Sequence, residues 1–310
     1  MNRVTVFMPV YNAERFLEEA IKSILNQTYK MFDFLIIDDG STDSSHEILE
    51  RYKEKDTRII LYENEENKGV CFTRNRGLDL CHTEYIAFMD ADDIAPLNRL
   101  EREISYLDSH QELVGVGGIA QNINEDGEVI SGMSPLFQNP DYIKVNMMFE
   151  NTLANGSVML CTNVYKEHGI KYWDKEFAED YRFYCEYLQY GKIANLNEIM
   201  QQYRNVSSGL TQTYKRNKDI IRKQALDEIH KFWYELYDFR FSEEEEIILL
   251  KCFGEDGRTD SKEELQCLYK ALGNMCLQAE KSGMDDVEML KVVCRKQYGK
   301  QVARAFWLWE

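Results

Sequence analysis

The stretch EYIAFMDADDIAP (residues 84–96) decides the fold. Its apolar run, YIAFM, has the composition of a buried strand and ends abruptly in three carboxylates, Asp90, Asp92 and Asp93. Like charges this close repel one another, and burying them without compensation costs several kcal/mol each. We therefore expect a cation at the carboxyl end of this strand.

Strand and helix patterns alternate around this stretch over the first 120 residues and predict βαβ units. Apolar or β-rich runs predict strands at 3–10, 32–38, 58–64 and 84–90. Amphipathic segments predict helices at 13–25, 41–55, 69–81 and 96–110. The expected fold class is α/β, with a mostly parallel, Rossmann-like sheet flanked by helices.

Three unusual loops follow the predicted strands: PVYN (9–12), DDGSTD (38–43) and DADD (90–93). In a parallel sheet the carboxyl ends of the strands share one edge, and open α/β sheets bind ligands at that edge. We therefore expect these loops to lie close together and to form a binding site.

Composition limits the classes of function and the compartment. The net charge of −17 and the pI near 4.9 disfavour nucleic acid as a partner, because its binders carry basic surfaces. An anionic small molecule stays open, since a bound divalent cation reverses the local field. The eight cysteines show no CxxC spacing, and the chain has neither the apolar region of a signal peptide nor a run of about 18 apolar residues. We expect reduced cysteines and a cytoplasmic protein.

Each acidic loop has a plain structural interpretation beside the functional one. In DDGSTD, Asp-Gly is typical of a turn and Ser41 or Thr42 could cap the following helix. A carboxylate there could instead accept the imide N–H of uracil or a ribose hydroxyl. DADD suits a clamp for Mg²⁺ or Mn²⁺ and a diphosphate, because hard cations prefer oxygen ligands; a solvated acidic turn is the alternative. No Walker A or G-x-G-x-x-G pattern supports an ATPase or a dinucleotide-binding protein.

Four ordered stretches resemble the family 2 glycosyltransferases of the GT-A fold: VTVFMPVYNAERFLEEAIKSILNQTY, FLIIDDGSTD, NEENKGVCFTRNRGL and YIAFMDADD. The resemblance covers roughly residues 3–100 and continues more weakly, through GSVML, AEDYRF and YRNVSSGLT, to about residue 212. It implies transfer of a sugar, with inversion, from a nucleotide diphosphate to an acceptor hydroxyl. Residues 1–212 are then the catalytic domain, and residues 213–310 a helical C-terminal region.

The resemblance also implies roles for residues of the donor site. Pro9 and Tyr11 are expected to flank the nucleotide base, and Asp39 to hydrogen-bond it. Asp90 is expected near the ribose, and Asp92 as the ligand of Mn²⁺ or Mg²⁺. Two further candidate contacts to the nucleotide or its phosphates are Arg74 and Lys68.

An inverting displacement needs a carboxylate that takes the proton of the acceptor. By resemblance this base is Asp180 in FAEDYRF, with Glu179 beside it in the acceptor region; the alternative is that both only stabilise a helix N-terminus. Gly156 and Ser157 match a segment that borders the acceptor site. Trp173 could stack on a sugar, and core packing is an equal alternative.

One departure concerns the segment YRNVSSGLT, where many relatives carry Tyr-Arg-x-His and this chain has Val206. A histidine contact to the diphosphate or metal is then absent. Candidate replacements are Arg204, Ser207, Ser208 and Thr211, and weak activity is the alternative. The five histidines of the chain show no metal-ligand spacing, and we assign none of them a catalytic role.

For the partners, the resemblance implies a UDP-sugar that donates a hexose or N-acetylhexosamine. The acceptor would be a glycan, a lipid-linked or a protein-linked hydroxyl, in the synthesis of cell-surface polysaccharide or glycoconjugates. The alternatives are a catalytically silent nucleotide-sugar-binding protein and a sugar-nucleotide pyrophosphorylase, although PVYNAERF lacks the Gly-rich basic loop of the latter. A phosphoacceptor receiver domain could account for the Asp-Asp pair at the end of a strand, but it gives no reason for the DADD stretch.

The C-terminal segment 291–310 mixes basic and aromatic residues. Such a segment can rest on an anionic membrane surface. Packing against the rest of the chain and a contact in a homodimer are the alternatives.

Overall fold

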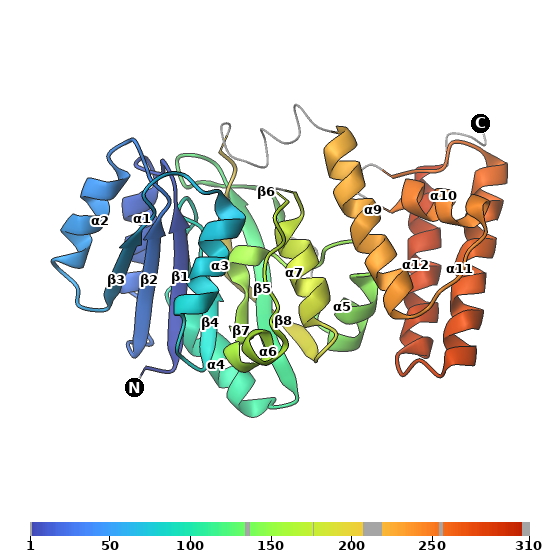
Figure 1. Ribbon diagram of the computed structural model, residues 1–310, viewed down its shortest axis with the longest axis horizontal. Coiled ribbons are helices and arrows are strands. Elements are labelled where there is room, and N and C mark those ends of the chain that lie inside the picture. Colours follow the sequence, from blue (N-terminus) through green and yellow to red (C-terminus); the bar gives the residue numbers. More distant parts are fainter. Residues whose placement is uncertain (1, 134–136, 176, 207–218, 254–256, 306–310) are drawn as a thin grey trace. The chain divides into compact units, whose positions relative to one another are not determined.

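The computed structural model describes residues 2–133, 137–175, 177–206, 219–253 and 257–305 (Figure 1). The chain divides into two compact units. The first consists of Met1–Gln138 and Leu153–Asn217, and the second of Asn139–Thr152 and Lys218–Glu310.

A mixed sheet forms the centre of the first unit. Its strands follow the order β3-β2-β1-β4-β7-β5-β6, and β8 pairs with β5. The strands are β1 (Val4–Val10), β2 (Phe32–Asp38), β3 (Ile59–Glu63), β4 (Tyr85–Phe88), β5 (Leu113–Ile123), β6 (Val129–Met133), β7 (Met159–Cys161) and β8 (Lys192–Arg204).

Parallel pairing joins the first four strands in the order β3-β2-β1-β4. Strand β7 runs antiparallel to both β4 and β5, and β8 is again parallel to β5. The carboxyl ends of β1 to β4 therefore share one edge, the upper one in Figure 1. The predicted α/β fold class is confirmed.

Helices cover both faces of this sheet. They are α1 (Leu17–Leu25), α2 (Ser45–Lys53), α3 (Val70–Leu80), α4 (Arg99–Ser109), α6 (Thr162–His168) and α7 (Glu179–Tyr187), with a 3₁₀ turn, η1, at Asn155–Ser157.

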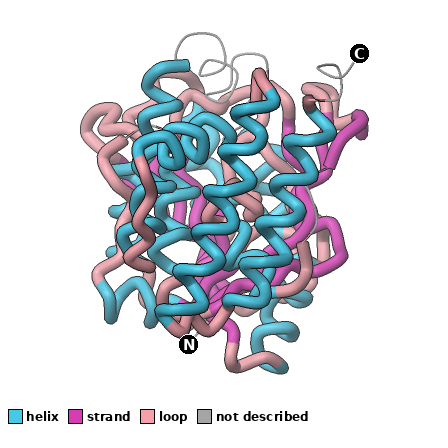
Figure 2. Tube along the Cα trace, turned by 90° about the vertical axis from the view of Figure 1, so that its right-hand side faces the viewer, coloured by secondary structure: helices cyan, strands magenta, loops and turns pink. Residues whose placement is uncertain are grey.

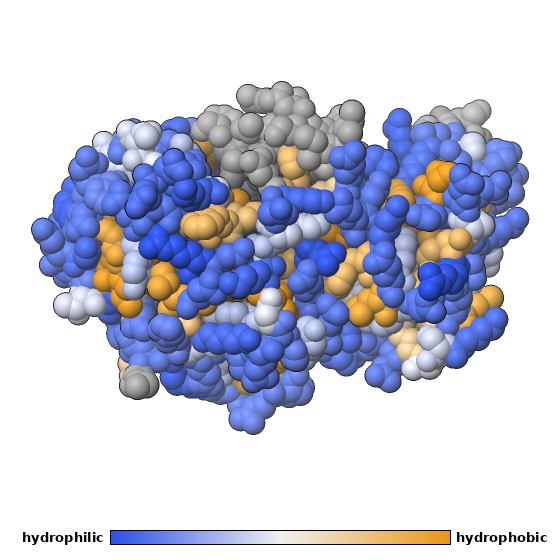
Figure 3. All heavy atoms as spheres, in the orientation of Figure 1, coloured by the Kyte–Doolittle hydropathy of each residue, from blue (hydrophilic) through white to orange (hydrophobic). Residues whose placement is uncertain are grey.

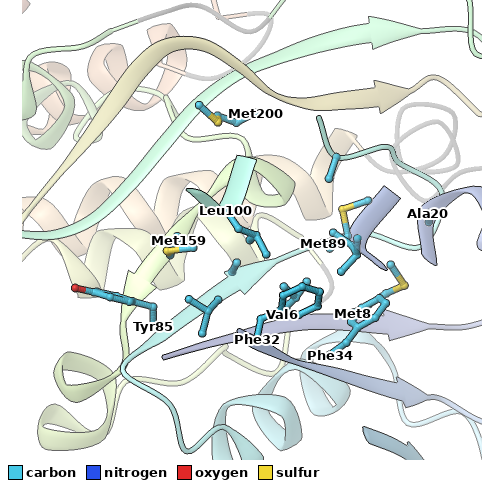
Figure 4. Close-up of a cluster of buried hydrophobic side chains, with 14 of the residues drawn as sticks. Val6, Met8, Ala20, Phe32, Phe34, Tyr85, Met89, Leu100, Met159 and Met200 are labelled. Atoms are coloured by element: carbon cyan, nitrogen blue, oxygen red, sulfur yellow. The ribbon is translucent and has the colours of Figure 1, made fainter. Parts of the chain in front are cut away.

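Side chains of β1 alternate between the two faces, as the period of a strand requires. Val6 and Met8 lie in a cluster of buried apolar residues that also takes Ala20 of α1 and Leu100 of α4 (Figure 4). Phe7 faces the other way, against α3, where a Cβ on Gly77 would lie 2.4 Å from its ring. A strand buried on both faces explains why every residue of β1 except Thr5 is apolar.

The second unit is helical. Its helices are α5 (Pro140–Asn146), α9 (Asp219–Leu236), α10 (Glu243–Cys252), α11 (Lys262–Ser282) and α12 (Val287–Arg304). Ser242 and Glu245 form a complete capping box at the start of α10. Helices α11 and α12 run side by side (Figure 2).

Residues 139–152 lie in the second unit, whereas the sequence analysis placed the division of the chain at residue 212. Phe149 is 1% exposed and its ring centroid lies 4.8 Å from that of Phe253. Gln297 of α12 donates hydrogen bonds to Asn146 Oδ1 (2.9 Å) and Glu150 Oε1 (3.1 Å). The apolar and polar partners of this segment thus lie in the C-terminal helices, more than a hundred residues along the chain.

Hydrophilic residues cover most of the face drawn in Figure 3, in keeping with the net charge of −17. Of the helices that the structure describes, none combines the length and the apolar composition needed to cross a membrane.

Candidate active site

The loops after β1 and β2 are joined by hydrogen bonds. The backbone N–H of Asn12 donates to Ser41 Oγ (3.0 Å), and the N–H of Thr42 donates to Asn12 Oδ1 (2.8 Å). Asn12 has a positive φ of 48°, which a short amide side chain tolerates. Beside it, Tyr11 is 47% exposed at the end of β1, and Pro9 lies opposite Ile37 of β2. The two residues expected to flank a base therefore lie at the predicted edge.

Asp39 is buried at the same edge and accepts three hydrogen bonds. Its Oδ1 receives Asn64 Nδ2 (2.6 Å) and the backbone N–H of Lys68 (3.0 Å), and its Oδ2 receives the backbone N–H of Gly69 (2.9 Å). A carboxylate has about four acceptor positions, so one stays available to an N–H or O–H donor of a ligand. Gly40, with φ of 68°, allows residues 64–69 to approach, because a Cβ there would lie 2.7 Å from the backbone of Glu66.

Lys68 contributes its backbone and not its ammonium group to this arrangement. Its side chain is exposed and forms an ion pair of 2.5 Å with Glu66. A direct contact of the Lys68 ammonium with a phosphate would require this surface pair to open.

At the end of β4, the carboxylate of Asp93 is 1% exposed and has partners on β8. It accepts hydrogen bonds from Gln201 Nε2 and from the backbone N–H of Arg204 (2.8 Å). A Cβ on Gly156 would lie 2.3 Å from Gln201 Nε2, so glycine is needed where η1 passes this amide. Asp93 therefore anchors the DADD loop to the sheet.

Arg204 holds the same loop from β8 and is 2% exposed. Its Nε donates to the carbonyl of Asp92 (2.8 Å), its Nη1 to the carbonyls of Asn124 (3.2 Å) and Glu125 (3.0 Å), and its Nη2 to Glu19 (2.5 Å). With four of its five N–H groups engaged, Arg204 positions the loop, and its role as a replacement for the missing histidine stays a prediction. The other candidate replacements, Ser207, Ser208 and Thr211, lie outside the described residues.

Asp90 and Asp92 complete the loop with charge that the protein compensates poorly. Burial and the neighbouring charge of Asp90 raise the pKa of the Asp92 carboxyl to about 6. Among the described residues no ion pair reaches the side chain of Asp92, and Asp90 meets only Arg74, at 3.4 Å. Two carboxylates at a strand end, with Arg74 as their one ion-pair partner among the described residues, fit a divalent cation, which proteins commonly hold by one or two carboxylates and substrate phosphates.

Arg74 links this loop to the start of α7. Its side chain is 8% exposed, and its Nη1 forms an ion pair of 2.6 Å with Glu179 while Nη2 lies 3.4 Å from Asp90. The guanidinium carbon also lies 5.4 Å from the ring centroid of Tyr172. Nearby carboxylates keep the pKa of Arg74 above its ordinary value against the cost of burial. Arg74 thus joins two of the predicted site segments, 105 residues apart in the sequence.

Asp180 follows Glu179 in the first turn of α7. Burial, and then the charge of Glu179, raise the pKa of its carboxyl to about 7. The preceding Ala178 has a left-handed φ of 51°, which costs a residue with a Cβ of the order of 1 kcal/mol. Such strain concentrates at functional sites, and a carboxyl that titrates near neutrality can exchange protons there.

Comparison with known proteins agrees with this geometry. The sequence profile of Glycosyl transferase family 2 matches residues 5–163. An uncharacterized glycosyltransferase of Haemophilus influenzae is 33% identical over 229 residues, which are 71% of each chain. The chain belongs to glycosyl transferase family 2.

One relative named with a specific activity and two solved structures extend the comparison. The Escherichia coli enzyme WfaP, named as a UDP-Glc:alpha-D-GlcNAc-diphosphoundecaprenol beta-1,3-glucosyltransferase, is 29% identical over 72% of this chain and 84% of its own. Staphylococcus aureus TarS (residues 1–349) with UDP-GlcNAc matches with a TM-score of 0.60 at 18% identity, over 97% of this chain and 93% of that one. The mannosyltransferase PcManGT of Pyrobaculum calidifontis, with GDP-Man and Mn²⁺, has a TM-score of 0.57 at 16% identity, over 98% and 86% of the two chains. The two structures confirm the GT-A fold.

In this family 2 glycosyltransferase, the residues expected at the acceptor site have different environments. Ser157 is fully buried, and the single O–H of its side chain lies within hydrogen-bonding distance of the carbonyls of Ala154 (2.8 Å) and Gly118 (3.2 Å). Trp173 is half-buried, with Lys175 Nζ at 5.1 Å and the Arg182 guanidinium at 5.9 Å from its ring. Its indole N–H has no hydrogen-bond partner among the described residues. Ser157 therefore supports the loops, whereas the indole nitrogen of Trp173 is buried without a partner among the described residues.

Sequence reasoning missed three residues that hold this family 2 site in place: Asn64, Gln201 and Arg204 in its structural role. Asn64 is 5% exposed, and besides Asp39 its Nδ2 reaches Thr73 Oγ1 (3.0 Å). A faint signal was available, because a polar residue directly after β3 and a Gln pair inside β8 interrupt otherwise strand-like runs. Their partners lie far away in the sequence, so that signal does not say what they bind.

Proposed function

We propose that this family 2 glycosyltransferase is an inverting enzyme that uses a UDP-sugar as donor. It moves a hexose or N-acetylhexosamine to a hydroxyl of a glycan, lipid-linked or protein-linked acceptor. The observation that carries the proposal is the bridge of Arg74, which ties Asp90 of the DADD loop to Glu179 beside Asp180. The candidate donor site and the candidate base therefore belong to one network of the first unit.

For the donor, the acceptor position left on Asp39 suits the imide N–H of uracil. Tyr11 and Pro9 would flank the base at the same edge, and Asp90 would lie near the ribose. The name of WfaP, which includes UDP-Glc, and the UDP-GlcNAc in the TarS structure support a uridine nucleotide. GDP-Man in PcManGT makes GDP the control nucleotide for the experiment below.

Asp92, with Asp90 beside it, would hold the cation, which is Mn²⁺ or Mg²⁺. When bound, this cation would stabilise the negative charge that develops on the departing diphosphate. The raised pKa of Asp92 supports the assignment, since it reflects negative charge with no full partner in the protein. Mn²⁺ in the related PcManGT structure points to the same chemistry.

Asp180 would act as the general base. Its carboxylate takes the proton from the acceptor hydroxyl while that oxygen forms a bond to the anomeric carbon. The bond from the anomeric carbon to the diphosphate breaks on the opposite face, so the configuration inverts. Because burial raises the pKa of Asp180 to about 7, the ionised base and therefore turnover should increase as the pH rises through about 7.

For the acceptor, the support comes from the name of a relative. The undecaprenol-linked acceptor in the name of WfaP favours a lipid-linked hydroxyl and a role in cell-surface polysaccharide or glycoconjugate synthesis. Such an acceptor fits a cytoplasmic enzyme at the inner face of the membrane, with residues 291–310 as the contact or as part of a homodimer. Residues 306–310 of that segment lie outside the described residues.

The first test is calorimetric titration with UDP and with GDP, each with and without Mn²⁺. Wild type should bind UDP in preference to GDP and only with the metal, and Asp92→Ala should lose this dependence. Asp126→Asn, an exposed carboxylate elsewhere in the first unit, is the matched control. Equal UDP binding by wild type and Asp92→Ala would overturn the metal and diphosphate assignment.

The second test separates an enzyme from a silent binding protein. Asp180→Asn should lower transfer by about 10²–10⁴-fold while UDP binding is kept, because only proton transfer is removed. Glu186→Gln, on the same helix, should keep both properties. Undiminished transfer by Asp180→Asn would contradict the assignment of the base. The silent binding protein would be favoured if wild type binds UDP but transfers no sugar in a panel of UDP-sugars with lipid-linked and glycan acceptors.

A further inference from the structure

Two carboxylates lie directly opposite each other at the edge of the parallel sheet. Asp38 ends β2, Glu63 ends β3, and the register pairs the two residues. Like charges directly opposite each other on neighbouring strands are unfavourable. The donor-site assignment uses neither residue, so this pair requires its own explanation.

His46, from the first turn of α2, completes a cluster with these carboxylates. Its Nδ1 lies 3.2 Å from Asp38 Oδ2, and one ligand atom from each of the three residues lies within 4.8 Å of the others. We propose that Asp38, His46 and Glu63 form a second metal site, separate from Asp92, for a transition-metal dication of the Zn²⁺ class. The cation would neutralise the opposed carboxylates.

The separation of His46 Nδ1 and Asp38 Oδ2 suits such an ion, and a Glu63 carboxylate oxygen lies within 4.8 Å of both. Zinc bonds to nitrogen and oxygen of about 2.0–2.2 Å place neighbouring ligand atoms of a tetrahedron about 3.3–3.5 Å apart. The pair of His46 and Asp38, at 3.2 Å, already has nearly this spacing. Glu63 is exposed, and His46 keeps 38% of its side-chain surface, so both can adjust to a shared ion. Water would fill the remaining position.

Asp38 is held in the orientation that a ligand needs. Its side chain is 1% exposed, and its Oδ1 accepts the backbone N–H of Ser41 at 3.0 Å, so that Oδ2 faces His46. Its carbonyl also accepts the N–H of Asn64 at 2.8 Å. Hydrogen bonds that orient a ligating carboxylate are typical of metal sites and strengthen them.

The donor set distinguishes this site from the one at Asp92. An imidazole nitrogen favours Zn²⁺ or Co²⁺, whereas a set of carboxylates and phosphates favours Mg²⁺ and Mn²⁺. Because Asp38 directly precedes Asp39, an ion here would clamp β2, β3 and α2 behind the loop that holds Asp39. We therefore expect Zn²⁺ to raise the thermal stability of the protein.

The test titrates metal-free, full-length protein with Zn²⁺ in excess Mg²⁺, which occupies oxygen-only sites. Calorimetry should give one equivalent of bound Zn²⁺. When Co²⁺ replaces Zn²⁺, the visible absorption spectrum should show the bands of a protein-bound Co²⁺ ion with a nitrogen ligand. His46→Gln and Glu63→Gln should each weaken binding by at least about tenfold. His82→Gln, an exposed histidine elsewhere in this unit, and Asp92→Ala should bind as wild type does.

Equal affinity of wild type and His46→Gln, or no stoichiometric binding by wild type, would overturn the proposal. If Asp92→Ala alone loses Zn²⁺ binding, the ion belongs to the DADD loop, and the proposal of a second site is overturned as well. Glu63→Gln changes an exposed side chain and keeps the test valid if His46→Gln does not fold. No donor sugar enters the measurement, so its result is independent of the proposed transfer reaction.

Discussion

The ends of β2 and β4 carry similar acidic sequences, DDG and DADD, yet the protein treats the two sets of carboxylates differently. At β2, Asp39 accepts hydrogen bonds from Asn64, Lys68 and Gly69. At β4 only Asp93 is satisfied in this way, and burial beside Asp90 raises the pKa of Asp92 to about 6. The first end is thus a preorganised hydrogen-bond acceptor, whereas the second keeps carboxylate charge that the protein balances only in part, through Arg74.

Crossing segments cause this difference. Residues 64–69 pass over the end of β2 and aim backbone N–H groups at Asp39, an approach that Gly40 permits. Strand β8 passes the end of β4 but directs its donors at Asp93 and at the carbonyl of Asp92. Two similar acidic turns therefore acquire opposite electrostatic properties from segments distant in the sequence.

The largest expected effect comes from removing the buried cation beside the β4 end. Arg74→Gln leaves Glu179 and Asp90 without their ion-pair partner, so we expect a loss of about 3–5 kcal/mol in the free energy of unfolding. Urea unfolding measures it, with Arg102→Gln as control, since its pair with Glu198 is exposed and worth at most about 1 kcal/mol. Similar small losses in both variants would show that Arg74 is not needed to balance the β4 end.

Asp39→Asn tests the end of β2, where the carboxylate has hydrogen-bond partners. In the wild type, three N–H donors meet the two carboxylate oxygens of Asp39. The amide of the variant has one acceptor oxygen and turns an NH₂ group toward some of these donors. The free energy of unfolding should therefore fall by about 1–3 kcal/mol. UDP affinity should fall as well, without a change in its dependence on Mn²⁺. Asp33→Asn, near the start of the same strand, is the control. An unchanged unfolding midpoint would refute the view that Asp39 is preorganised.

Gly156→Ala tests how the DADD loop is anchored. The new methyl would lie 2.3 Å from Gln201 Nε2 and push away the amide that donates to Asp93, at a cost of about 1–3 kcal/mol. Gly273→Ala, in α11 with open space around it, should instead gain about 0.5–1 kcal/mol. Thermal unfolding compares the two; a gain in both would mean that the loop does not depend on Gln201.

Asp92→Asn is expected to change stability by the smallest amount and in the opposite direction. The folded protein raises the pKa of Asp92 from 3.8 to about 6, so it binds a proton there more tightly than the unfolded chain does. The stabilisation from that proton is complete below about pH 4 and is lost as the pH rises through about 6. At pH 7 the variant should therefore be about 1–2 kcal/mol more stable than wild type, even though metal-dependent binding is lost.

Unfolding midpoints of Asp92→Asn and wild type, measured without metal between pH 4 and pH 7, check this prediction. The two midpoints should converge at the acid end of the range. A loss of stability at pH 7 would mean that the two strand ends do not differ in the way described.

Much of the fold and part of the candidate site could be predicted from local patterns. The strand that ends at Asp90, the turn after Asp39 and the helix that begins near Asp180 are set by neighbouring residues, and the structure has all three. The partners of Lys68 and Arg204 were harder to predict, because a lysine or an arginine near a predicted nucleotide site suggests a contact with phosphate. In the structure the Lys68 side chain pairs with Glu66, and Arg204 donates to backbone carbonyls. Which partner a long cationic side chain meets is a property of tertiary packing.

By itself, the sequence determined the alternation of strands and helices and the acidic residues at two strand ends, because hydrophobic periodicity and turn chemistry act over a few residues. Only the tertiary structure decided which of those carboxylates are satisfied, since the donors come from residues 64–69, from β8 and from Arg74. It also brought Asp38, His46 and Glu63 together, although their spacing in the sequence matches no metal-binding motif. It decided, too, that residues 139–152 pack in the second unit. Hydrogen bonds and ion pairs act over a few ångströms, and only the folded chain brings residues this distant in sequence within that range.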